Sequence, residues 1–307
     1  MGVRASRHAA SASTWLVAVA LCAVLAGCSA VTQSPVPTGA PTGAAATPGT
    51  SSQGSQPPLP ASLRVYFGVG STSGNPILAP VERPASTATD VEGSATDALA
   101  ALVAGPKDNE LSASPAMFTA IATGTTIKGL QIDTAGVATV DVSTEFQETD
   151  ELPSLRTSLA QVVFTLTQFP EVTGVQVTIG GAVLSQTDAN GKDLGRPATR
   201  ADYEDQMGPL FVDSPTWGAT VHSPIHLSGL ADVFEATFRF RLLDAAGRSL
   251  ADGQLHASCG TGCLGTFGVD VPFNVSASTT GHLQVFDLSE ADGSMADVVD
   301  YPVTLQP

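Results

Sequence analysis

Two cysteines near the end of the chain have the spacing of a small covalent loop. Cys259 and Cys263 enclose Gly260-Thr261-Gly262, a stretch flexible enough for the two thiols to meet. In an oxidising compartment such a pair forms a disulfide. A redox pair usually has two intervening residues at a helix start, and zinc needs two further ligands at short spacing. We predict a structural disulfide between Cys259 and Cys263, with the redox pair and the half zinc site as alternatives.

A third cysteine, Cys28, ends an N-terminal leader. Two arginines precede an uncharged apolar run, which is followed by Leu25-Ala26-Gly27-Cys28. The run is shorter than the roughly 20 apolar residues of a membrane-spanning helix. The sequence around Cys28 resembles the bacterial lipobox, in which the cysteine receives diacylglycerol and becomes the new N-terminus. We therefore expect residues 1–27 to be a removed lipoprotein signal peptide and the lipid on Cys28 to anchor the protein; the alternative is a chance cysteine in a cleaved leader.

The charge of the remaining chain excludes one class of partner. Residues 1–27 contain two arginines and no acidic residue, so 11 of the 13 basic residues remain beside all 29 acidic ones, a net charge of −18. Phosphate contacts require basic clusters, which are absent from the sequence. We expect no nucleic-acid partner.

Residues that could perform hydrolysis are poorly arranged. The run Gly68 to Gly74 contains serines but lacks the spacing of a nucleophile elbow, and no histidine lies between His8 and His222. We expect a plain loop at this run, no catalytic residue and no cofactor.

Metal-binding residue types occur in two patterns. Asp188, Asn190 and Asp193 surround one glycine, and a similar acidic group surrounds Gly293, but both offer too few oxygen ligands for a calcium loop. We interpret them as hairpin turns. The second pattern consists of scattered histidines, which we interpret as partly exposed packing residues although a shared metal site is the alternative; they are His222, His226, His256 and His282.

The chain divides by composition into a tether and two modules. Residues 28–62 are rich in Pro, Gly, Ser, Thr and Ala with almost no charge, and such a segment buries too little apolar surface to fold. Residues 63–185 and 208–307 have the length of two ordinary domains, joined by a polar connector over 186–207.

The first module has the pattern of an α+β fold. Its helices carry apolar residues at spacings of three and four, and its strands alternate apolar and polar residues. The order β-α-β-β-α-β predicts a two-layer α+β sandwich. The expected elements are a strand over Leu63 to Val69, a helix capped by Ser94 through Val103, strands over Ile127 to Asp133 and Val137 to Val142, a helix from Pro153 to Pro170, and a strand over Val175 to Ile179.

The second module has strands alone. About seven short apolar runs follow one another at regular spacing, which predicts an all-β sandwich of the immunoglobulin-like kind. The expected strands are Leu210 to Val212, Ile225 to Gly229, Phe234 to Leu243, Leu250 to Ala257, Phe267 to Phe273, His282 to Leu288 and Val298 to Leu305.

Both modules resemble known families. Residues 63–185 resemble the GerMN domain, named from a spore-germination lipoprotein, through Val65-Tyr66-Phe67, Val140-Asp141-Val142-Ser143 and above all Gln161 to Phe169. Residues 208–307 resemble the immunoglobulin-like domain of bacterial spore germination through Ser214-Pro215 and Leu227-Ser228-Gly229. The resemblance implies an envelope lipoprotein without established catalytic residues, whose α+β module is similar to ring-building domains that assemble side by side.

These observations favour one class of function. We expect a lipid-anchored protein on the outer face of the cell membrane that acts as a non-catalytic protein-binding or scaffold module. Its partner would be another envelope protein or its own copy, met through an exposed sheet edge or helix face. The alternative is a ligand-binding lipoprotein or a cell-wall-active enzyme, which requires a converging polar cluster.

Overall fold

The computed structural model describes residues 58–70, 77–148 and 155–307. They belong to one compact unit that spans Gln56–Pro307. The leader, Cys28, most of the tether, the serine run after Gly70 and the expected helix start at Pro153 lie outside the described residues. No helix in the described ranges is long and apolar enough to cross a membrane.

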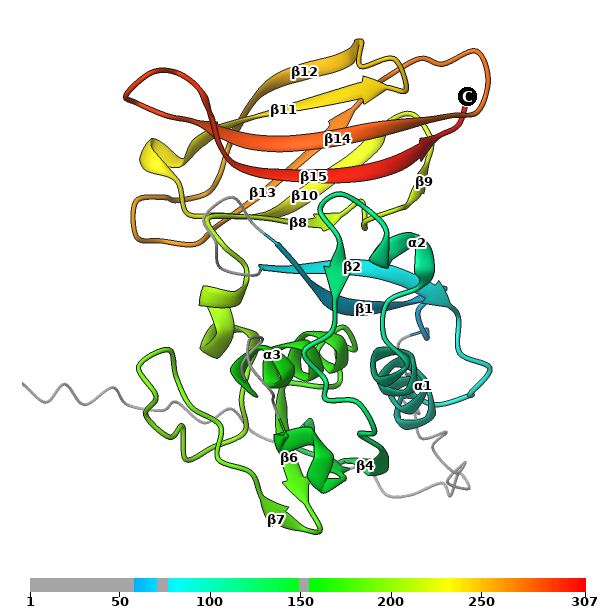
Figure 1. The fold of residues 1–307 in the computed structure, drawn as a ribbon, viewed down its shortest axis with the longest axis vertical. Coiled ribbons are helices and arrows are strands. Elements are labelled where there is room, and N and C mark those ends of the chain that lie inside the picture. Colours follow the sequence, from blue (N-terminus) through cyan, green and yellow to red (C-terminus); the bar gives the residue numbers. More distant parts are fainter. Residues whose placement is uncertain (1–57, 71–76, 149–154) are drawn as a thin grey trace, which may run out of the picture. The chain divides into compact units, whose positions relative to one another are not determined.

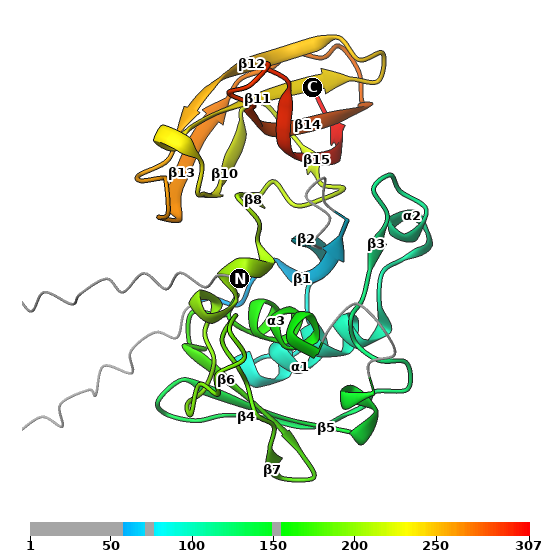
Figure 2. The same ribbon diagram turned by 60° about the vertical axis from the view of Figure 1, so that its left-hand side comes forward.

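The first module places its two main helices between two sheets. The helices α1 and α3 contact β1 on one side and β4 or β6 on the other, as both views show (Figures 1 and 2). The elements are β1 (Ser62–Val69), β2 (Ile77–Pro84), α1 (Val91–Ala104), α2 (Asp108–Leu111), β3 (Met117–Phe118), β4 (Ile127–Ile132), β5 (Val137–Val142), η1 (Thr144–Gln147), α3 (Leu155–Leu166), β6 (Gly174–Ile179) and β7 (Ala182–Val183).

The two sheets differ in topology. One has the order β2-β1-β3 and is antiparallel. The other has the order β4-β5-β6-β7, and its central pair β5 and β6 is parallel. Parallel neighbours need a crossover, which α3 provides. Because β4 is the terminal strand of its sheet, one of its edges pairs with no described strand.

The α+β class of this module is confirmed, while its layering differs from the expected two layers. The strands that the pattern placed in one sheet are divided, with β1 in the first sheet and β4 to β6 in the second. The sequence pattern also did not predict the strands β2, β3 and β7. Three layers form because α3 is buried on both faces and packs against β1 and β6. Its apolar residues Leu159 and Val163 are buried, and so is the polar Gln161.

The start of α1 corrects another expectation. Asp90, and not Ser94, is the N-cap, and its side chain accepts a hydrogen bond from the Gly93 N–H at 2.7 Å. Ser94 lies inside the helix and is fully buried. The helix begins four residues earlier than expected because an aspartate is a strong capping residue and Gly93 tolerates the close approach of its side chain.

The second module is a β-sandwich, as the pattern predicts. One sheet has the order β13-β10-β8 and the other β12-β11-β14-β15-β9. Along β11 the residues Phe238, Phe240 and Leu242 point into the core, since alternate residues of a strand share a face. The elements are η2 (Arg200–Gln206) in the connector, then β8 (Leu210–Ser214), β9 (Thr220–Val221), β10 (Ile225–Ala231), η3 (Phe234–Ala236), β11 (Thr237–Asp244), β12 (Ser249–His256), β13 (Gly265–Val271), β14 (Thr279–Leu288) and β15 (Met295–Leu305).

Candidate functional site

A partly buried polar network joins the two modules at Tyr66. This residue lies on β1, fully buried, with its ring edge-on to Phe164 at a centroid distance of 5.4 Å. Its hydroxyl donates to Asp213 Oδ1 at 3.0 Å and accepts from Arg200 Nη2 at 3.1 Å. Burial raises the pKa of Tyr66, so the phenol stays protonated and able to donate. One hydroxyl therefore links the first module, the connector and the second module.

Arg64 extends the network on the same strand. Its Nη1 donates to Asp213 Oδ2 at 2.6 Å, and Gln168 holds its backbone by accepting from the N–H and donating to the carbonyl oxygen, both at 2.7 Å. Burial alone would lower the pKa of Arg64, but Asp213 and Tyr66 together raise it by more, and the net shift of the pKa is upward. The guanidinium is therefore charged and fixed in position.

Arg200 is held still more firmly. Its Nε donates to Thr167 Oγ1 at 2.8 Å and its Nη2 also donates to the Phe164 carbonyl oxygen at 3.1 Å. The guanidinium carbon lies 5.1 Å from the Tyr66 ring centroid and 4.9 Å from that of Phe164, within cation–π range. Its Nη1 has no hydrogen-bond partner among the described residues, so part of its donor capacity is open.

A cavity of about 600 Å³ lies over this network. Its size is within the range of small-molecule sites, which occur preferentially between domains. Its lining is mainly polar and includes both arginines. The lining residues are Pro60, Ala61, Ser62, Arg64, Tyr66, Glu82, Thr167, Gln168, Arg200 and Asp213.

A backbone contact fixes the junction at a second place. The Trp217 N–H donates to the Pro80 carbonyl oxygen at 2.9 Å, and Trp217 forms a parallel bridge with Val81 of β2. A strand of the first module therefore pairs directly with the loop between β8 and β9. Together with the Tyr66 network, this contact holds the two modules as one body.

A second hollow runs along the free edge of β4. It has a volume of about 430 Å³ and lies between the exposed side of α1 and the strand. Ile132 at the end of the strand donates its N–H to Glu92 Oε2 at 3.1 Å, so a side chain of the described residues covers that end of the edge. The lining residues are Thr96, Ala100, Val103, Thr125, Thr126, Ile127, Lys128, Gly129 and Leu130.

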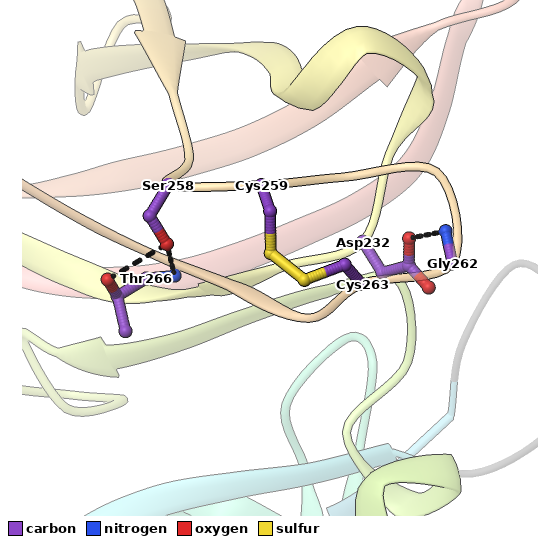
Figure 3. Close-up of a disulfide and its surroundings, with 6 residues drawn as sticks. All are labelled: Asp232, Ser258, Cys259, Gly262, Cys263 and Thr266. Atoms are coloured by element: carbon purple, nitrogen blue, oxygen red, sulfur yellow. Dashed lines mark hydrogen bonds between the residues drawn. A yellow bond between two sulfur atoms is a disulfide. The ribbon is translucent and has the colours of Figure 1, made fainter. Parts of the chain in front are cut away.

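The disulfide between Cys259 and Cys263 is present, with a Cα separation of 5.8 Å. Its loop is fixed against the turn before β11, because the Gly262 N–H donates to Asp232 Oδ1 at 2.7 Å (Figure 3). The Thr261 N–H likewise donates to the Val233 carbonyl oxygen at 3.1 Å. These contacts favour a structural role for the disulfide over the redox and zinc alternatives.

The histidines of the second module are not brought together. Among the described residues, no group of three or more His, Cys, Asp or Glu side chains is placed to hold a metal ion. Each histidine has separate partners: His222 contacts the Pro307 carbonyl oxygen at 3.5 Å, His226 pairs with Asp270 at 2.8 Å, His256 contacts Thr237 at 3.1 Å and Gln254 at 3.2 Å, and His282 pairs with Asp300 at 2.8 Å.

The two acidic turns use their carboxylates locally. Asp188 Oδ1 accepts from the N–H groups of Asn190 and Lys192 at 2.8 and 3.0 Å. Asp292 Oδ1 accepts from both the N–H and the hydroxyl of Ser294. Carboxylates that cap their own turn in this way have the geometry of hairpin turns.

Sequence reasoning missed the junction. Arg64, Tyr66, Arg200 and Asp213 were not among the candidate residues, although their side chains form the polar network between the two modules. The available signal was Tyr66, a tyrosine in an apolar strand whose buried hydroxyl needs a partner. The partners themselves lie more than 130 positions away along the chain, beyond the reach of periodicity.

Comparison with known proteins supports the two-module reading. Residues 64–185 match a family model described as sporulation and spore germination, and residues 210–294 match one described as an immunoglobulin-like domain of bacterial spore germination. No curated protein matches the chain significantly.

Solved structures with similarity to the chain include two from a sporulation protein. The first GerMN domain of GerM from Bacillus subtilis is 22% identical, with 46% of this chain and 99% of that chain covered and a TM-score of 0.36. The tandem GerMN domains of the same protein are 17% identical, with 80% of this chain and 61% of that chain covered and a TM-score of 0.37. By the two family models, residues 64–185 match a sporulation and spore germination domain and residues 210–294 match an immunoglobulin-like domain of bacterial spore germination.

Proposed function

We propose that this chain is a lipid-anchored protein on the outer face of the cell membrane that acts as a non-catalytic protein-binding or scaffold module. The lipobox-like sequence ending at Cys28 supports the anchor. The two domain families, which are not established enzyme families, support a role without catalysis. The alternative remains a ligand-binding lipoprotein or a cell-wall-active enzyme.

The observation that carries the binding role is the free edge of β4. A terminal strand offers unpaired backbone N–H and C=O groups to another strand. Beside it, Ala100, Val103 and Leu130 line a hollow that can receive alternate side chains of the added strand. An edge beside an apolar hollow is the geometry of strand addition, in which the backbone gives affinity and the hollow gives selectivity. The occupant we propose is an extended segment of a partner envelope protein.

The polar side chains of the described residues support a non-catalytic reading. Tyr66 and Asp213 are engaged with each other, and the acidic turns and histidines have local partners. A hydrolase needs a nucleophile within hydrogen-bond reach of a base that a third group orients. Among the described residues, two histidines pair with a carboxylate, His226 with Asp270 and His282 with Asp300, and neither ring has a hydroxyl or thiol side chain as a further hydrogen-bond partner.

One substitution tests the strand-addition surface. Ala100 is exposed on α1 and lines the hollow, so Ala100→Arg places a long charged side chain where the partner's apolar residues would sit. The matched control is Ala291→Arg, the same change in the exposed turn between β14 and β15. In whole cells, cross-linking of the full chain should give an adduct that Ala100→Arg removes and Ala291→Arg retains.

The outcome distinguishes the possible partners. An adduct of twice the mass of the chain would identify its own copy as the occupant and would replace the proposed partner. Adducts unaffected by Ala100→Arg would place binding elsewhere and contradict the β4 proposal. Hydrolytic turnover of envelope substrates by the detergent-solubilised chain, lost with one point substitution, would contradict the non-catalytic role.

A further inference from the structure

The cavity at the module junction has a balanced set of charges. Arg64 and Arg200 contribute two positive charges, and Asp213 and Glu82 contribute two negative charges. The whole chain has a net charge of −16. A purely anionic ligand would therefore enter a neutral cavity in an acidic protein, which gives it no long-range electrostatic attraction. A molecule with one charge of each sign fits this balance better.

The positive side of the cavity is preformed. Arg200 is held by hydrogen bonds from its Nε and Nη2, which leaves Nη1 without a partner among the described residues. Arg64 uses only Nη1 toward Asp213, so its Nε and Nη2 also remain open within the described part of the chain. A guanidinium with a fixed plane and open donors suits a carboxylate, because both groups are planar.

The negative side is Glu82. This residue lies on β2 directly opposite Arg64 in the antiparallel pair, so both side chains lie on the same face of the sheet. Its side chain is exposed, lines the cavity and makes no hydrogen bond or ion pair with the described residues. Asp213, in contrast, is already shared by Arg64 and Tyr66. Glu82 is therefore the acceptor left for an ammonium group.

We propose that this cavity binds a small zwitterion that carries a carboxylate and an ammonium group, an amino acid or short peptide. Arg200 and Arg64 receive the carboxylate and Glu82 receives the ammonium. The volume of about 600 Å³ accommodates a short peptide. This binding site goes beyond the scaffold role and does not depend on the free edge of β4.

Tri-alanine is the probe, because its charges are those of the main chain ends and its side chains are minimal. Calorimetry on the detergent-solubilised full chain compares tri-alanine with its N-acetyl form, which lacks the ammonium, and its C-terminal amide, which lacks the carboxylate. Each missing charge removes a charge-assisted hydrogen bond and should weaken binding about tenfold or more. Absence of heat from tri-alanine at millimolar concentration, or equal binding of the amide, would overturn the proposal.

The Glu82→Gln variant assigns the ammonium contact. It should weaken tri-alanine binding about as much as N-acetylation does, and it should have no further effect on the N-acetyl form, because both changes remove the same interaction. Glu290→Gln, in the exposed turn between β14 and β15, is the matched control and should bind as the wild type does. Additive losses from Glu82→Gln and N-acetylation would refute the role of Glu82.

Discussion

The hydroxyl of Tyr66 in the first module donates a hydrogen bond to Asp213 in the second module across 3.0 Å, with the tyrosine fully buried and the aspartate side chain 32% exposed. The same oxygen accepts from Arg200 of the connector. A buried hydroxyl with two charged partners is costly to leave unsatisfied. The contact therefore favours one relative placement of the two domains.

Removing this hydroxyl should destabilise the protein. Tyr66→Phe removes one hydrogen-bond partner from Asp213 and one from Arg200, and a hydrogen bond to a charged group contributes about 2 kcal/mol. Urea unfolding of the full chain measures the loss. The matched control is Tyr203→Phe, because Tyr203 is equally buried but its hydroxyl has no hydrogen bond in the structure; it should change the free energy of unfolding by less than about 0.5 kcal/mol. If the two substitutions lower the free energy of unfolding equally, the hydrogen bonds of Tyr66 do not stabilise the junction.

The fold class was readable from the sequence because its signals are local. The strands β1, β5, β6 and β11 alternate or run apolar over five or more residues, and α3 repeats at three and four. The strand β2 was missed because Pro80 and Pro84 interrupt its apolar run, although proline is tolerated in an edge strand. The strands β3, β7 and β9 have two residues each, too few for any period.

The junction was not readable for a different reason. Arg64 and Asp213 are 149 positions apart, and Tyr66 and Arg200 are 134 apart. Periodicity shows which face of an element is buried but not which distant element covers it. The disulfide between Cys259 and Cys263, with only three residues between them, was predictable from spacing alone.

Stability should fall at acid pH partly through Asp202. The hydrogen bond from Arg196 lowers the pKa of Asp202 from 3.8 to about 2, against the opposing effect of burial. A carboxyl group with a lowered pKa in the folded state stabilises the fold fully above its unfolded pKa and loses that effect as pH falls from about 4 through about 2. Asp202→Asn should be less stable than the wild type at pH 7, and the difference should shrink between pH 4 and pH 2 in thermal unfolding. A difference that stays constant with pH would contradict the assignment.

Loss of the disulfide should have a modest and local effect. The closed loop of five residues is short, and chain entropy gives a stabilisation of about 2 kcal/mol for such a loop. The double substitution Cys259→Ser with Cys263→Ser should lower the free energy of unfolding by about that amount. Adding a thiol reductant should destabilise the wild type similarly and leave the double variant unchanged. If the reductant also destabilises the double variant, a group other than this disulfide responds to the reductant.

The anchor depends on one sulfur. Cys28→Ala removes the atom that would carry the lipid, so the variant should leave the membrane fraction and appear in the medium. Fractionation of cells that express the wild type or the variant measures this distribution. Ser29→Ala, the neighbouring change that keeps the cysteine, should stay with the membrane. Membrane retention of Cys28→Ala equal to that of the wild type would rule out the lipid anchor.

The most direct test of the binding role is a photo-cross-linking residue placed at Lys128, which is exposed on β4 and lines the hollow. Irradiation of whole cells should cross-link the residue at position 128 to one partner protein. Ala100→Arg in the same chain should abolish this cross-linked product. The same residue at Ala291 should give no such product. A product that survives Ala100→Arg, or no product from Lys128 at all, would mean that the free edge of β4 is not where this protein binds.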